Sequence, residues 1–284
     1  MRMNMKYKII VDSCCDLTEE LKMDQHFQVI PLTLQVGDTY MVDDETFDQA
    51  RFLRLVDESA ECPKSACPSP ESFKLAYEAA DAEGIFVVTL SQHLSGTYNS
   101  AQLAKNLYEE EHGKDKKIAV FSSDSAASGE SLIALKIQEL CEAGLSFEEV
   151  VEQISGFRDH MLTYFVLENL DTLRKNGRLS GLQALFATAL NIKPVMAGDH
   201  GVIVKLDQAR GINKALNKMI DLAVKSAVNT EKKILGITHC NCLERALYVK
   251  DEICRRLKFK DIYIVDAAGV SSMYANEGGI VMCL

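Results

Sequence analysis

The segment Ser91–Ala101, SQHLSGTYNSA, combines closely spaced hydroxyl side chains with a glycine just before a predicted helix. Backbone N–H groups and the positive end of the helix dipole attract anions at such a position, so Ser95, Gly96 and Thr97 could bind a carboxylate or a phosphate. The alternative is ordinary N-capping by Ser95 or Thr97. The residues alone leave both interpretations open, because one hydroxyl can serve in both ways.

A second hydroxyl-rich segment is the loop Lys64–Phe73, KSACPSPESF. Ser65 could donate a hydrogen bond to a ligand. Ser69 is expected to cap a helix that begins at Pro70, because the missing N–H of a proline costs nothing in the first turn. The loop therefore offers one candidate ligand residue beside one structural residue.

Further polar groups follow predicted strands at Asp12 with Ser13 and at Ser123–Ser125. They could bind a metal or a phosphate, and one hypothesis is a small-molecule kinase or phosphatase that uses Asp12, Asp124 and a metal. Such residues more often fix turns through side-chain to backbone hydrogen bonds, which is the interpretation we favour.

The segment Leu173–Ser180, LRKNGRLS, places Arg174, Lys175 and Arg178 around a glycine turn. These cations could pair with acids of the other half of the chain, neutralise a ligand or remain solvated. Arg178 follows Gly177 directly and is the cation that we expect to be held in place.

The chain lacks the G-x-S-x-G nucleophile elbow, the Walker sequence and the G-x-G-x-x-G dinucleotide fingerprint. The pair Cys240 and Cys242 is spaced too closely for the usual zinc knuckle. We therefore assign no catalytic residue and no metal ligand, and the hydroxyls at strand ends favour binding over catalysis.

Repeated units of strand, polar turn and helix must position these candidates. Strands are expected at 7–11, 27–36, 84–90 and 117–121, a loop at 62–70, and helices at 46–60, from Pro70, from Gly96 to about 111, at 128–143 and at 147–161. This order predicts an α/β fold with a parallel sheet flanked by helices on both faces. Ligands bind at the carboxyl ends of such strands, where the serine-rich turns fall.

After residue 160 the pattern changes to a mixed α/β arrangement. Short helices are expected at 167–175 and 180–190, paired strands at 193–196 and 202–206, longer helices at 211–228 and 242–257, and strands at 233–238, 262–266 and 280–284. We therefore expect an N-terminal domain at 1–160 and a C-terminal domain at 161–284. The net charge changes from −15 in the first part to +5 in the second, which fits two domains.

The bulk composition narrows the class of protein. The net charge of −10 argues against a nucleic-acid binder. The nine cysteines are expected to be free thiols in a reducing cytosol. We see no signal peptide and no apolar span of membrane length, so a cytoplasmic protein is expected.

Six segments, in order along the chain, resemble the DegV family of bacterial fatty-acid-binding proteins. They are Val11–Asp16, Ser65–Phe73, Leu94–Ala101, Ser123–Gly129, Leu170–Ser180 and Leu190–Pro194. The resemblance implies the two-domain DegV-like α/β fold, also called the EDD fold. It also implies one long-chain fatty acid, of the palmitate, stearate or oleate type, in a buried tunnel, with no cofactor and no catalysis by the protein itself.

Carried over by motif, Ser65 and Ser95 would hold the carboxylate, with Gly96, Thr97 and Arg178 as secondary candidates. Serine stands at position 65 where the family usually has threonine, so the hydroxyl is kept and a methyl group is lost. Some members deliver the bound acid to a separate fatty acid kinase, which uses ATP to phosphorylate the carboxylate. The resemblance thus implies a fatty acid kinase as partner, and a transient contact with a membrane is also expected.

The chain departs from the family near its C-terminus. Many members have a histidine followed by Gly-Pro-Gly, whereas this chain reads YANEGG at Tyr274–Gly279. If that histidine engages the carboxylate or the kinase, Tyr274 or Asn276 is expected to replace it.

Overall fold

The first sheet of the computed structural model is four-stranded and parallel, as predicted. The structure describes residues 5–179 and 191–284. In sheet order the strands are β2 (Phe27–Ile30), β1 (Tyr7–Asp12), β6 (Gly84–Thr89) and β7 (Lys117–Ser122). Every residue of β6 is buried, which explains its continuous apolar sequence.

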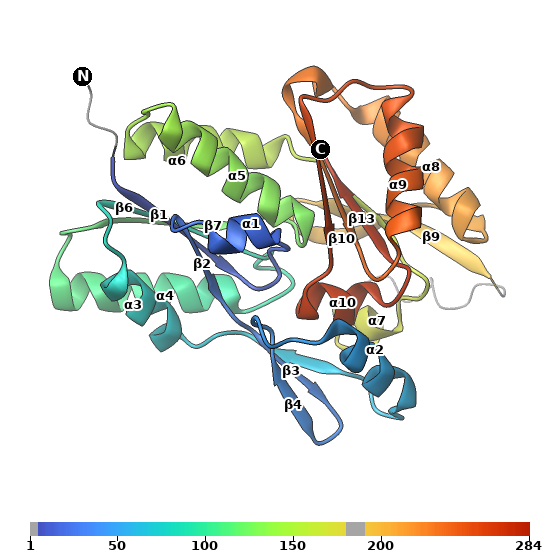
Figure 1. Ribbon diagram of the computed structural model, residues 1–284, viewed down its shortest axis with the longest axis horizontal. Helices are drawn as coiled ribbons and strands as arrows, with labels where there is room; N and C mark the ends of the chain where they lie inside the picture. Colours follow the sequence, from blue (N-terminus) through green and yellow to red (C-terminus); the bar gives the residue numbers. More distant parts are fainter. Residues whose placement is uncertain (1–4, 180–190) are drawn as a thin grey trace.

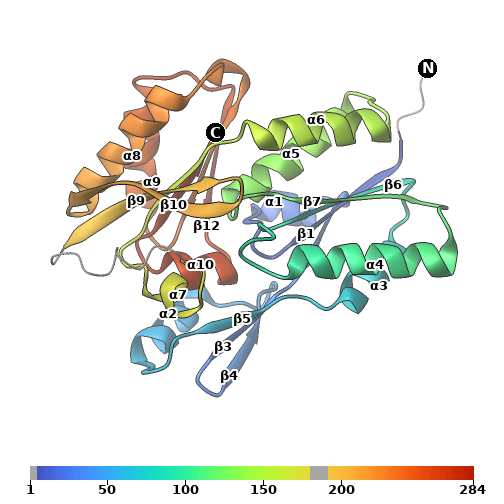
Figure 2. The same cartoon turned by 180° about the vertical axis from the view of Figure 1, so that it is seen from behind.

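Helices cover both faces of this sheet (Figures 1 and 2). Ile9 and Val11 of β1 pack under one pair of helices, and Ile10 packs under the other pair. Successive side chains of a strand point to opposite faces, so β1 contributes to both cores. The helices are α5 (Ser128–Glu142) and α6 (Phe147–Asp159) on one face, α3 (Pro70–Ala79) and α4 (Thr97–His112) on the other, and the short α1 (Glu19–Met23) after β1.

A small antiparallel sheet follows, which the sequence did not predict. It consists of β4 (Thr39–Val42), β3 (Thr33–Val36) and β5 (Lys64–Ala66), and α2 (Gln49–Glu58) lies between β4 and β5 in the chain. The prediction of a single strand at 27–36 was wrong, because the chain leaves the first sheet at Pro31 and β3 pairs elsewhere. The predicted loop at 62–70 was also partly wrong, since β5 carries Ser65 and pairs with β3.

The second large sheet is mixed and six-stranded. Its order is β10 (Val202–Arg210), β9 (Ile192–Asp199), β8 (Thr163–Val166), β13 (Ile280–Cys283), β11 (Ile234–His239) and β12 (Asp261–Asp266). The predicted hairpin is confirmed as the antiparallel pair β9 and β10, which is longer than expected. Strand β8 was missed, and the helix expected at 167–175 begins only at Asp171.

Helices cover one face of the second sheet and leave the other to face the first half of the chain (Figure 1). The elements after residue 166 are α7 (Asp171–Lys175), α8 (Ile212–Ser226), the 3-10 turn η2 (Thr230–Lys232), α9 (Leu243–Cys254) and α10 (Gly269–Ala275). Of these, α8 and α9 form a core with the sheet, and α10 packs against α2 and α7. Helix α10 was not predicted, and the helix expected at 180–190 lies outside the described residues.

The chain thus has the α/β fold expected from the sequence, with a parallel sheet flanked by helices followed by a mixed sheet. None of the helices within residues 5–179 and 191–284 is both long enough and apolar enough to cross a membrane.

Candidate functional site

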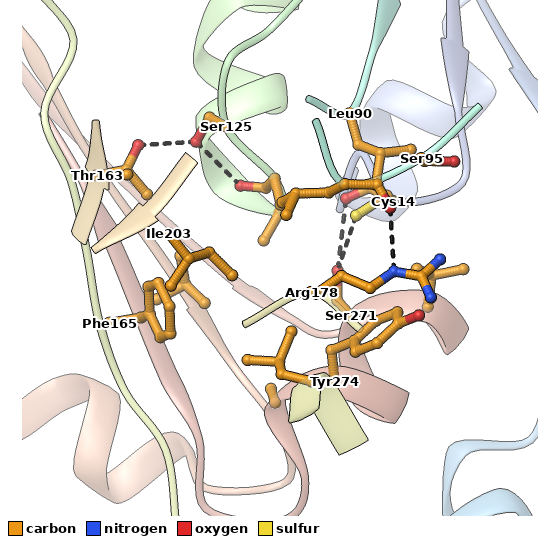
Figure 3. A pocket seen from close by; sticks show the side chains of 18 of the residues that line it. Cys14, Leu90, Ser95, Ser125, Thr163, Phe165, Arg178, Ile203, Ser271 and Tyr274 are labelled. Carbon is orange, nitrogen blue, oxygen red and sulfur yellow. Dashed lines mark hydrogen bonds between the residues drawn. The ribbon is translucent and has the colours of Figure 1, made fainter. Parts of the chain in front are cut away.

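A cavity lies at the carboxyl ends of β1, β6 and β7, where these face the second sheet and α10 (Figure 3). The volume of the cavity is about 110 Å³. Apolar side chains from both halves of the chain line most of it, among them Leu90, Phe165, Ile203 and Val281. This is the edge of the first sheet at which the sequence predicted a ligand.

Four of the polar side chains that line the cavity come from distant segments and lie at one part of it. Ser65 on β5 and Tyr274 on α10 bring their hydroxyl oxygens to 3.3 Å from each other. Ser95 and Arg178 line the same cavity, and the guanidinium carbon of Arg178 lies 5.6 Å from the centre of the Tyr274 ring. The structure therefore brings together Ser65, Ser95, Arg178 and Tyr274, which the sequence singled out from segments far apart in the chain.

The start of α4 shows how Ser95 is held. Gly96 is the N-cap residue of this helix and makes no side-chain cap. The Oγ atom of Ser95 accepts a hydrogen bond from the Thr97 amide at 3.3 Å and lies 2.9 Å from the Thr97 hydroxyl. Ser95 thus has a local structural role and also lines the cavity, whereas Gly96 and the buried Thr97 are not among the lining residues.

Arg178 is fixed by the turn that ends α7. Gly177 has φ +76°, a left-handed conformation that glycine adopts at little cost, and the Arg178 amide donates to the Leu173 carbonyl at 2.8 Å. The Arg178 side chain then reaches the first half of the chain, where Nε donates to the Leu94 carbonyl at 3.1 Å. The prediction that Arg178 is held in place is confirmed.

Tyr274 has the position and the protonation state of a hydrogen-bond donor. Burial raises the pKa of its phenol, so the hydroxyl keeps its proton at neutral pH. Asn276 does not line the cavity, and its side-chain amide donates to the Tyr274 carbonyl at 3.3 Å. Asn276 has φ +56°, so it closes the turn after α10 on which Tyr274 sits.

The turns after β1 and β7 are fixed by their own polar side chains. Asp12 accepts hydrogen bonds from the amides of Cys14, at 2.9 Å, and Leu90, at 2.8 Å. Ser123 accepts from the Ser125 amide at 3.1 Å. The favoured interpretation of these residues as turn-forming is confirmed, although Asp124 and Ser125 also line the cavity.

Buried carboxylates of the first half position α10, and with it Tyr274. Asp43 accepts from the Gly269 and Val270 amides, at 2.6 and 2.8 Å, and Asp16 accepts from the Ala268 amide at 2.8 Å. Burial raises the pKa of Asp43, and it raises the pKa of Asp16 to about 7. Negative charge at the start of a helix is stabilising, which offsets part of this cost.

Several lining residues were not expected from the sequence. Cys14 and Ser271 face each other with Sγ and Oγ 3.8 Å apart, and Thr163 bonds to the Ser125 hydroxyl at 2.7 Å. The missed elements β8 and α10 carry two of them. The run Thr163–Val166, TYFV, is rich in β-branched and aromatic residues and could have indicated a strand.

The hypothesis of a metal-dependent kinase or phosphatase has little support in this geometry. Asp12 is fully buried and spends one oxygen on each of two backbone amides. Asp124 accepts from the Ser122 hydroxyl at 2.8 Å and lies 3.4 Å from Arg158 Nε. Both carboxylates are therefore already used by the protein.

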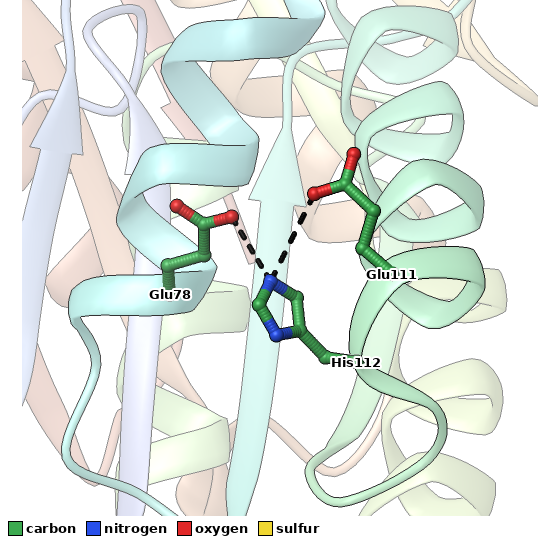
Figure 4. Close-up of side chains that lie close together, drawn as sticks. All are labelled: Glu78, Glu111 and His112. Carbon is green, nitrogen blue, oxygen red and sulfur yellow. Dashed lines mark hydrogen bonds and ion pairs between the residues drawn. The ribbon is translucent and has the colours of Figure 1, made fainter.

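Within the described ranges, one group of side chains has the spacing of a metal site, Glu78, Glu111 and His112 on α3 and α4 (Figure 4). All three are exposed or partly exposed, and none lines the cavity. Lys74 already brings its ammonium group to 2.6 Å from Glu111 and 3.5 Å from Glu78. The group is best described as a surface ion-pair cluster between two helices.

Comparison with known proteins places nearly the whole chain in one family. Residues 6–284 match the sequence model described as "Uncharacterised protein, DegV family". A DegV domain-containing protein of Streptococcus pneumoniae is 38% identical over 98% of each chain.

Solved structures of DegV family proteins are also similar to this chain over nearly its whole length. A DegV family protein of Ruminococcus gnavus, refined with vaccenic acid, is 51% identical with a TM-score of 0.95, covering 99% of this chain and 100% of that one. The Fatty Acid Kinase (Fak) B3 protein of Streptococcus pneumoniae, loaded with linoleic acid, is 38% identical with a TM-score of 0.89, covering 98% and 99%. With a family match over nearly its whole length, this chain belongs to the DegV family.

Proposed function

We propose that this protein binds one long-chain fatty acid in the cavity and presents the carboxylate to a partner protein, a fatty acid kinase. The observation that carries the proposal is an apolar cavity with Ser65, Ser95, Arg178 and Tyr274 grouped at one part of its lining. A fatty acid has the same division, with one charged end and a long apolar chain. The acids bound by the Ruminococcus gnavus and Streptococcus pneumoniae relatives support the same ligand class.

Ser65, Ser95, Arg178 and Tyr274 together provide the donors that a bound carboxylate needs. Burying an ionised carboxylate without partners is very unfavourable, so its oxygens need donors. Ser65 and Ser95 supply hydroxyl donors, Tyr274 supplies a phenol that stays protonated, and Arg178 supplies a cation. In this assignment Tyr274 takes the place of the histidine that many family members have, and Gly96, Thr97 and Asn276 act by shaping the backbone around it.

The apolar part of the lining provides the affinity. Each methylene group that leaves water for an apolar site contributes about 0.8 kcal/mol. A chain of palmitate length therefore gains enough to overcome the entropy lost on binding. Cys14 lines the cavity but is not expected to react with a bound ligand. Burial raises the pKa of its thiol well above the usual value, so the reactive thiolate is disfavoured.

The role of presentation follows from the position of the polar group. Ser65, Ser95, Arg178 and Tyr274 are only partly buried, so the carboxylate end would lie near the surface, where a kinase can reach it. The protein would itself catalyse no reaction, and the phosphoryl transfer from ATP would be carried out by the partner. We place this role in the cytoplasm, in keeping with the nine free thiols.

The proposal is tested by displacement of a fluorescent fatty acid from protein that has been stripped of lipid. We expect saturable binding at one site per chain and competition by palmitate, stearate and oleate. Hexadecan-1-ol and methyl palmitate, which have a similar apolar area, should compete more weakly, because they lack the carboxylate. Equal competition by acids and by neutral lipids would contradict the head-group assignment, and absence of saturable binding would contradict the function.

A further inference from the structure

Three residues on neighbouring strands form a straight row across the second sheet. Gly198 on β9 is directly opposite Ile203 on β10 and directly opposite Thr163 on β8. Directly opposite residues of antiparallel strands direct their side chains to the same face of a sheet. Thr163, Gly198 and Ile203 all line the cavity, so a side chain at position 198 would point into it.

The backbone gives no reason for a glycine at position 198. Its φ is not in the left-handed region, in contrast to Gly201 in the same hairpin, which has φ +80°. A Cβ atom on Gly198 would lie 3.5 Å from Thr163 Cβ and 3.6 Å from the Asp124 carbonyl oxygen, which are ordinary contacts. Glycine inside a strand weakens it and often marks a site where a ligand comes close to the backbone.

The row lies away from the polar side chains that are assigned to the carboxylate. Figure 3 shows Thr163 and Ile203 on one side of the cavity with Phe165, and Ser95, Arg178 and Tyr274 on the other. A fatty acid whose carboxylate meets the polar group would therefore bring the later part of its chain toward Gly198.

We propose that Gly198 determines which acyl chains this protein accepts, because its missing side chain leaves room for the end of a long chain between Thr163 and Ile203. This inference rests on the proposed function. Larger residues at position 198 would shorten the cavity and shift the preference toward shorter acids. Since a methylene contributes about fourfold to affinity, a chain end that no longer fits gives a large and length-dependent loss.

The test compares Gly198→Ala and Gly198→Val with the unmodified protein in the displacement assay. The competitors are dodecanoic, tetradecanoic, hexadecanoic and octadecanoic acids. For Gly198→Val we expect about a tenfold or greater loss for octadecanoic acid and a much smaller loss for dodecanoic acid. Gly198→Ala should show the same trend to a smaller degree, and it serves if the valine variant folds poorly.

Ala197→Val is the matched control. Ala197 neighbours Gly198 on β9, but it is packed in the core under α8 on the opposite face of the sheet. This change should lower stability through overpacking while leaving the order of preference among the four acids unchanged.

A second variant separates lost space from damaged folding. Ile203→Ala removes as many carbons from the opposite residue as Gly198→Val adds, so the double variant should recover binding of octadecanoic acid. A uniform loss for all four acids, or no recovery in the double variant, would overturn the proposal. If the unmodified protein bound none of the acids, the proposed function itself would fail, and the two failures are therefore distinguishable.

Discussion

The phenol oxygen of Tyr274 lies 3.3 Å from the hydroxyl oxygen of Ser65, although the two residues are 209 positions apart in the sequence. One belongs to the small sheet of the first half and the other to α10 of the second half. The polar end of the cavity is thus built only when the two halves pack together. Any change in this packing would alter the head-group site directly.

The first prediction concerns the two serines. Ser65→Ala combined with Ser95→Ala should weaken fatty-acid binding by about 2–4 kcal/mol, because two hydrogen bonds to a charged acceptor are lost. Displacement of a fluorescent fatty acid measures this loss. Ser69→Ala is the control, because Ser69 lies in the same segment but caps α3 by accepting from the Ser72 amide at 3.2 Å. Equal affinities in the double variant and the control would refute the assignment of Ser65 and Ser95.

The second prediction concerns chemistry. The isolated chain should neither hydrolyse ATP nor form an acyl phosphate in the presence of ATP, Mg²⁺ and palmitate. An enzyme would need the carboxylates of Asp12 and Asp124. Asp12 already accepts hydrogen bonds from two backbone amides, and Asp124 is already paired with Arg158. Turnover above the background without protein, abolished by Asp124→Asn, would instead favour an enzyme.

The third prediction concerns the partner. Arg174 and Lys175 are exposed on α7, close in sequence to Arg178 of the cavity. Changing both to glutamate should slow partner-dependent phosphorylation of the bound acid and alter its dependence on salt, while the affinity for fatty acid stays nearly unchanged. Surface charges act mainly on encounter rates, which is the physical reason for this difference.

Lys225→Glu, on the exposed end of α8, is the control for a general effect of charge. The competing explanation is that the α7 cations hold the two halves together. It would be favoured if the double variant lost thermal stability and lipid affinity along with partner activity.

The fourth prediction concerns pH. Glu130 is fully buried, and burial together with the nearby Asp12 carboxylate raises its pKa well above the usual value of 4.5. The folded state therefore holds a proton that the unfolded chain releases above pH 4.5. This contribution to stability is fully present below that pH and is lost progressively as the pH rises.

Glu130→Gln keeps the shape of the side chain and removes the ionisable group. Its melting temperature relative to that of the unmodified protein should increase steadily as the pH rises from about 5 to 8. If the difference in melting temperature between the two proteins stayed constant across this pH range, Glu130 would not titrate as inferred.

Much of the first half could be predicted from the sequence, because its strands are continuous apolar runs and its helices carry recognisable caps. Ser69, for example, caps α3 as expected. The break at Pro31 was missed because apolar residues continue to alternate through it, although a proline cannot donate to a sheet. Strands β4 and β5 are short and depend on pairing with β3, which no local pattern reveals.

The site itself was predictable only in part. Ser65, Ser95 and Arg178 lie in recognisable motifs, so the sequence pointed to them, whereas Tyr274 was named only as a replacement for the histidine that many family members have. Gly198 and Thr163 carry no such signal, because their place in the lining depends on the register of three strands. The proximity of Cys14 to Ser271 likewise arises from the packing of α10 against the turn after β1.

Native mass spectrometry of the purified protein, compared with denaturing mass spectrometry of the same sample, tests the central claim most directly. The account predicts a native mass that exceeds the chain mass by one long-chain fatty acid, and release of that acid on denaturation. The Ser65→Ala and Ser95→Ala double variant should lose most of this adduct. A native mass equal to that of the bare chain, even after incubation with palmitate or oleate, would contradict the account.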